Sequence, residues 1–107
     1  MSADIHDVDR ETYREVTEDG LTLLWFCAEW SAPCKAMEPA LADIAAEHPR
    51  LFVARVDADE HGDLLADFGA DAVPTTVLLE DGKPVRVFEG FLPGLELERE
   101  LLERTSA

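Results

Sequence analysis

The sequence predicts a three-layer α/β fold in which a parallel pair of strands is extended by an antiparallel hairpin. Two continuous apolar runs of strand length, Leu21–Cys27 and Leu51–Val56, indicate strands that are covered on both faces. Segments with apolar residues at helical spacing alternate with these runs, as in parallel strands joined by helices. The dipeptide Asp81-Gly82, which lies between two further strand-like runs, indicates a tight hairpin.

In the first half of the chain, we expect a helix that starts after a cap at Asp9 and ends near Asp19, where Gly20 follows. After the strand at Leu21–Cys27, an amphipathic helix is expected from about Ala32 to His48, and Pro49 ends it. Pro39 lies inside this helical pattern and predicts a kink.

In the second half, a short helix is expected over Asp59–Phe68, before Gly69. The hairpin strands are expected at Thr75–Leu79 and Val85–Phe88. Pro93 stands where a last amphipathic helix begins. The predicted order is therefore helix, strand, helix, strand, helix, hairpin, helix.

The charge of the chain is its most unusual property. With 107 residues it is expected to form one domain over 1–107, and 24 acidic against 9 basic residues give a formal net charge of -15. This balance argues against nucleic acid and anionic membranes as partners, because both are bound through clusters of Lys and Arg. Two interpretations stay open: an acidic surface that keeps the protein solvated, or an adaptation to high salt, which screens self-repulsion.

The sequence predicts a cytoplasmic protein. The N-terminus is acidic and lacks the basic and apolar regions of a signal peptide. The longest apolar run, Leu21 to Ala28, is far shorter than the ~20 residues of a membrane span. The two cysteines of an intracellular chain are expected to be free thiols or redox groups.

The segment from Trp30 to Lys35, Trp-Ser-Ala-Pro-Cys-Lys, stands at a predicted strand-to-helix junction. It resembles the active-site segment of the thioredoxin family, Trp-Cys-Gly-Pro-Cys-Lys. Val73-Pro74-Thr75 resembles the cis-proline loop of that family, and the hairpin, Gly82 and Gly90 follow in the family's order. This resemblance covers nearly the whole chain and implies the thioredoxin fold, a central mixed β-sheet flanked by helices on both faces.

The resemblance also implies an activity and a site. The function implied is that of a protein disulfide oxidoreductase, with protein disulfides or client peptides as substrates and a thioredoxin reductase as a further partner. A cis bond at Pro74 would place the Val73 backbone beside the thiol, where an extended peptide adds hydrogen bonds as a strand does. The substrate-binding residues implied are Trp30, Ala32, Pro33, Val73 and Pro74.

Departures from the family's pattern bear on the redox chemistry at three positions, Ser31, Trp25 and Cys27. Ser31 stands in the place of the nucleophilic cysteine, and Cys34 matches the resolving cysteine. A serine hydroxyl has no redox couple, so dithiol cycling is expected to be absent in this chain, and Ser31 also fits a helix N-cap. Trp25 stands where the family has a buried aspartate, and Cys27 replaces the tryptophan that follows.

The two cysteines are therefore interpreted differently. Cys34 follows Trp-x-x-Pro at a predicted helix N-terminus, which favours a redox thiol over an inert buried one. Cys27 ends an apolar strand and is expected to be a core residue. A Cys27–Cys34 disulfide would need Cα atoms within about 7 Å, which a strand residue and a residue of the following helix need not satisfy. Neither cysteine lies in a metal-binding spacing, so no metal and no cofactor are expected.

Three hypotheses remain for function. The first is a thioredoxin-like oxidoreductase with Ser31 at the nucleophile position and Cys34 as its redox thiol. The second is a redox-silent module that uses the same groove to bind clients or a partner enzyme. The third is a monothiol protein in which Cys34 forms a mixed disulfide with glutathione or links two otherwise monomeric chains.

Overall fold

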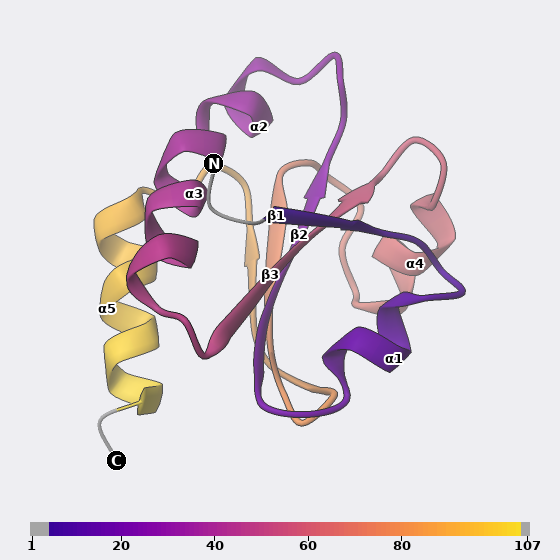
Figure 1. Ribbon diagram of the computed structural model, residues 1–107. Helices are drawn as coiled ribbons and strands as arrows, with labels where there is room; N and C mark the ends of the chain where they lie inside the picture. The colour runs from indigo at the N-terminus through magenta and orange to yellow at the C-terminus, as the bar shows by residue number, and fades with distance from the viewer. Residues whose placement is uncertain (1–4, 106–107) are drawn as a thin grey trace.

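The computed structural model describes residues 5–105, in which a five-stranded mixed sheet lies between helices on both of its faces (Figure 1). The order of strands across the sheet is β1-β3-β2-β4-β5. β3 pairs in parallel with β1 and β2, and β4 pairs antiparallel with β2 and β5. The predicted α/β fold, a parallel pair extended by a hairpin, is confirmed. The strands are β1 (Ile5–Val8), β2 (Leu21–Cys27), β3 (Leu51–Asp57), β4 (Thr75–Glu80) and β5 (Lys83–Glu89).

Strand β1 was not predicted. Its four residues contain only two apolar side chains, Ile5 and Val8, and none of the four is fully buried. It lies at the sheet edge, where Ile5 pairs with Val53 of β3. An edge strand this short is held by its neighbour and carries little hydrophobic pattern of its own.

The helices are shorter than predicted, and the break near Pro39 is larger. The expected helix from Ala32 to His48 consists of two helices that meet at Met37. Pro39 lies in the first turn of the second helix, where its missing N–H costs no intrahelical hydrogen bond. The predicted kink is therefore a helix boundary. The helices are α1 (Tyr13–Thr17), α2 (Ala32–Ala36), α3 (Glu38–Glu47), α4 (Gly62–Asp67) and α5 (Gly94–Thr105).

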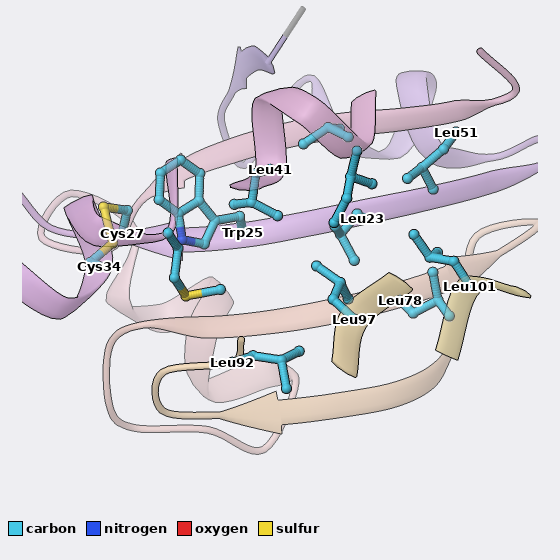
Figure 2. Packing of buried hydrophobic residues seen from close by; sticks show 13 residues of the cluster. Leu23, Trp25, Cys27, Cys34, Leu41, Leu51, Leu78, Leu92, Leu97 and Leu101 are labelled. Atoms are coloured by element: carbon cyan, nitrogen blue, oxygen red, sulfur yellow. A yellow bond between two sulfur atoms is a disulfide. The ribbon is translucent and has the colours of Figure 1, made fainter. Parts of the chain in front are cut away.

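The central strand β2 separates two hydrophobic clusters. Leu23, Trp25 and Cys27 pack on the face that α3 and α5 cover, whereas Leu24 and Phe26 pack on the face of α4 (Figures 1 and 2). This alternation follows from the two-residue period of a strand. It places Cys27, the last residue of β2, on the face of the sheet that α3 and α5 cover.

The hairpin and the ends of the sheet agree with the sequence signals. Asp81 and Gly82 both have positive φ, 52° and 82°, as a two-residue hairpin turn requires. Gly20 donates its backbone N–H to Asp81 Oδ1 at 2.8 Å, which ties the start of β2 to the hairpin. Among residues 5–105, no helix is long and apolar enough to cross a membrane.

Candidate redox site

The site is built where β2 ends and α2 begins. After Cys27 the chain turns, and Ser31 donates its backbone N–H to Ala28 O at 3.1 Å. Ser31 has an extended backbone, and its hydroxyl accepts a hydrogen bond from Cys34 N at 3.2 Å. Pro33 occupies the first turn of α2, where a proline is favoured. Ser31 is therefore the N-cap of α2, which is the structural role that the sequence allowed for it.

Cys27 and Cys34 form a disulfide across this turn (Figure 2). Their Cα atoms are 5.5 Å apart, well inside the range that a disulfide needs. The doubt raised from the sequence about this pairing was wrong, because the tight turn after β2 folds α2 back over the strand's last residue. Cys27 is a core residue, as expected. It also supplies the disulfide partner for Cys34 that this chain was expected to lack, because Ser31 stands at the nucleophile position.

The pairing also corrects the expectations for Cys34 on its own. Cys34 is fully buried and its sulfur is bonded to Cys27. In this state it offers no free thiol for a glutathione adduct or for a link between two chains. Of the two residues, Cys27 is the more exposed, at 9%, and it lines a surface pocket of about 660 Å³.

Backbone carbonyls lie beside both sulfurs. Cys34 Sγ is 3.8 Å from Phe26 O, and Cys27 Sγ is 3.8 Å from Ala28 O. A disulfide sulfur carries no proton to donate, but after reduction each thiol has an acceptor already in place. The surroundings of the pair therefore suit the dithiol as well as the disulfide.

Trp25 fills the place next to the disulfide where the family has a buried aspartate. Its side chain is fully buried in the same cluster as Cys27 and Cys34 (Figure 2). Among residues 5–105, its indole N–H has no hydrogen-bond partner. The chain thus has an apolar ring and an unpaired donor where a carboxylate would take up a proton, as the sequence comparison with the family suggested.

The residues expected to bind substrate lie at the same end of the sheet. Trp30 is 71% exposed, and its indole N–H donates to Asp59 Oδ1 at 3.0 Å. Ala32 and Pro33 are exposed on the first turn of α2. The Val73–Pro74 peptide bond is cis and directly precedes β4, whose first residue pairs with Phe26. Val73 is partly buried and Pro74 is buried.

Two features of this region were missed by sequence reasoning. The first is the pocket beside Cys27, whose charged lining comes from β1, α2, α3 and β3 and from the loop after β3. The second is Phe91, which is exposed and follows Gly90, whose N–H donates to Pro74 O at 2.7 Å. The pocket and the position of Phe91 both depend on segments that are far apart in the chain, so no local sequence pattern predicts them.

A group with metal-ligand chemistry lies elsewhere. Glu47, His48 and Glu98 place one ligand atom each within 4.8 Å of one another, where the end of α3 meets α5. His48 Nε2 and Glu98 Oε2 are 2.6 Å apart. This contact joins the two helices, and the group does not include either cysteine.

Known proteins match both the sequence and the fold. The family model described as Thioredoxin matches residues 4–103. A thioredoxin of Alicyclobacillus acidocaldarius is 31% identical, and the match covers 89% of this chain and 91% of that protein. A thioredoxin of Chlamydia trachomatis is 36% identical, and the match covers 73% of this chain and 76% of that protein. The crystal structure of thioredoxin from Trypanosoma brucei brucei superposes with a TM-score of 0.89 at 29% identity and covers 100% of this chain and 96% of its own.

A buried cysteine pair at a strand-to-helix junction of a mixed sheet defines an α/β protein of the thiol–disulfide oxidoreductase class. The chain belongs to the thioredoxin family. Members of this family act on protein disulfides and on reductases, which agrees in kind with the partners that the sequence predicted.

Proposed function

We propose that this protein is a thiol–disulfide oxidoreductase that exchanges electrons with protein disulfides through the Cys27–Cys34 pair. The observation that carries the proposal is the disulfide between the end of β2 and the first turn of α2, next to the position of the family's active-site segment. Ser31 cannot take part in a redox couple and caps α2 instead. The pair that cycles is then Cys27 with Cys34, in place of the family's Cys-x-x-Cys.

The exposure of the two cysteines supports a different role for each, since Cys27 is 9% exposed and Cys34 is fully buried. In the reduced protein, the Cys27 thiolate attacks one sulfur of the substrate disulfide, and the first substrate thiolate leaves and is protonated by solvent. The Cys34 thiolate then attacks Cys27 Sγ, the mixed disulfide breaks, and the second substrate thiolate leaves and is protonated. Two electrons and two protons pass from the two thiols to the substrate. A dithiol such as dithiothreitol, or a reductase, reverses the change on the protein by the same exchange.

The residues proposed to bind the client follow β2 and precede β4, the strands that pair beside the disulfide. Trp30, Ala32 and Pro33 offer exposed contact area, and the backbone of Val73 next to Pro74 offers strand-like hydrogen bonds to an extended peptide. A reducing role of this kind fits the cytoplasmic location predicted from the sequence.

The test is reduction of insulin disulfides with dithiothreitol as the electron source. We expect the protein to accelerate the reaction above dithiothreitol alone, and Cys27→Ser and Cys34→Ser each to return it to that background. Ser31→Ala is the matched control, because it changes the same turn and removes no sulfur; it should keep the activity. Thermal melts of all variants show that each is folded under the assay conditions.

Two outcomes would overturn the proposal and favour the alternatives. A parent protein no faster than dithiothreitol alone would support the redox-silent binding module. Activity that survives Cys27→Ser and is lost only with Cys34→Ser would support the monothiol protein, since one sulfur would then be sufficient.

A further inference from the structure

We propose that the pocket beside Cys27 selects cationic disulfides, so that the protein reduces cystines flanked by lysine or arginine in preference to anionic disulfides such as oxidised glutathione. This inference rests on the proposed redox function of the Cys27–Cys34 pair and names the substrate class that reaches it.

The pocket is the access to the redox pair. Its volume is about 660 Å³, enough for a long side chain that extends from a substrate next to its cystine. Cys27 is part of its wall, whereas Cys34 is not. A substrate sulfur that approaches Cys27 therefore brings its flanking groups against the rest of the lining. The acidic residues of this lining are Asp7, Asp9, Glu29, Glu38, Asp57 and Glu60.

The lining is more acidic than the chain as a whole. Six of its 12 residues are Asp or Glu, compared with 24 of 107 in the full sequence. Lys35 and Arg55 are its two cations, and His61 lies 3.9 Å from Glu60. The pocket is thus net negative, with six carboxylates against two cations.

The two cations leave most of this charge uncompensated. Arg55 donates from Nε to Asp7 Oδ1 at 2.7 Å, and this hydrogen bond raises the pKa of Arg55 against the effect of its partial burial. The carboxylates of Glu38 and Glu29 also raise the pKa of Arg55 through their negative charge. Within residues 5–105, neither Glu29 nor Glu38 forms a salt bridge. Lys35 is the second cation of the lining, and it forms no salt bridge within the same residues.

The other carboxylates of the pocket are held as acceptors. Asp9 accepts backbone hydrogen bonds from Glu11 and Thr12, and the bonds from Thr12 lower the pKa of the Asp9 carboxyl. Asp57 accepts from the backbone N–H of Asp59 at 2.9 Å. Asp9 is therefore expected to stay ionised at neutral pH. Charges of one sign in a concave site concentrate counter-charged ligands and repel like-charged ones, an effect that salt weakens.

The test compares three small disulfides as oxidants of the reduced protein: cystamine, which is cationic, 2-hydroxyethyl disulfide, which is neutral, and oxidised glutathione, which is anionic. Each second-order rate constant is divided by that of the same disulfide with dithiothreitol, which removes intrinsic reactivity. At low salt we expect the normalised rate for cystamine to exceed that for oxidised glutathione by about tenfold or more, and the ratio to fall toward one in molar KCl.

Two variants separate the pocket from the net charge of the molecule. The triple variant Glu29→Gln, Glu38→Gln and Glu60→Gln should lower the ratio at low salt several-fold. The matched control Glu15→Gln, Glu18→Gln and Glu103→Gln removes the same charge near α1 and at the end of α5, away from α2 (Figure 1), and should leave it nearly unchanged. Equal ratios in both variants, or no preference for cystamine in the parent, would overturn the inference. Failure of all three disulfides to oxidise the protein would instead overturn the proposed redox function.

Discussion

At the scale of single residues, the site depends on what stands at positions 25, 27 and 31. Ser31 caps α2 but has no sulfur, whereas Cys27 has one at the last position of β2. The small Cys27 side chain, where the family has tryptophan, reaches Cys34 because the two Cα atoms are only 5.5 Å apart. Trp25 closes the space beside the pair with an apolar ring, so a proton acceptor is absent from that position.

Trp25 gives a prediction about the cost of restoring the family's carboxylate. Trp25→Asp should lower the free energy of unfolding by about 4 kcal/mol or more, because it leaves a cavity and buries an unpaired acid in a fully buried position. Trp25→Phe is the control: it removes the unpaired N–H and some volume, and should cost about 1–2 kcal/mol. Denaturant unfolding measures both. Equal stability of the two variants would show that the site accommodates a carboxylate.

At the scale of elements, the sequence was informative where the signal is local. The runs that became β2 and β3, and the Asp81-Gly82 turn, were predicted because hydrophobic period and turn chemistry are contained in short windows. Strand β1 and the Cys27–Cys34 bond were missed because each depends on a partner brought close by the fold. The split of the long helix at Met37 was predicted only as a kink, since a proline marks an interruption but not its extent.

The disulfide that joins β2 to α2 gives a prediction for stability. It closes a short loop, with a sequence separation of 7. Loop-closure entropy for this length corresponds to roughly 2–3 kcal/mol, so reduction should lower the melting temperature by about 10 °C or more. Calorimetry with and without dithiothreitol tests this. The double variant Cys27→Ser with Cys34→Ser should not respond to the reductant, and an unchanged melting temperature of the reduced parent would contradict the prediction.

At the scale of the whole molecule, the net charge of -15 opposes the compact fold through self-repulsion. Within the described residues, ion pairs such as Arg10–Asp63 and Arg86–Glu100 involve only a minority of the carboxylates. Each exposed ion pair contributes little to stability. Screening by salt is therefore the main effect that can reduce the repulsion between the carboxylates of this surface.

Salt dependence of stability tests whether this surface is an adaptation to high salt. If it is, the melting temperature should rise by more than about 5 °C between dilute buffer and molar KCl, which corresponds to roughly 1 kcal/mol for a chain of this size. Thermal unfolding followed by circular dichroism measures the shift. A melting temperature that stays flat over this range would leave only the interpretation of a solvating acidic surface.

The central claim is that Cys27 and Cys34 are a redox couple and not a structural staple. Its most direct test is equilibration of the protein in dithiothreitol buffers of graded ratio, followed by alkylation and intact-mass analysis. The account predicts a two-electron transition from zero to two alkylated cysteines, Cys27 and Cys34, with a midpoint potential above about -300 mV, as for disulfides that exchange with cellular thiols. A midpoint below that value, or no alkylation of the folded protein even under the most reducing conditions, would contradict it.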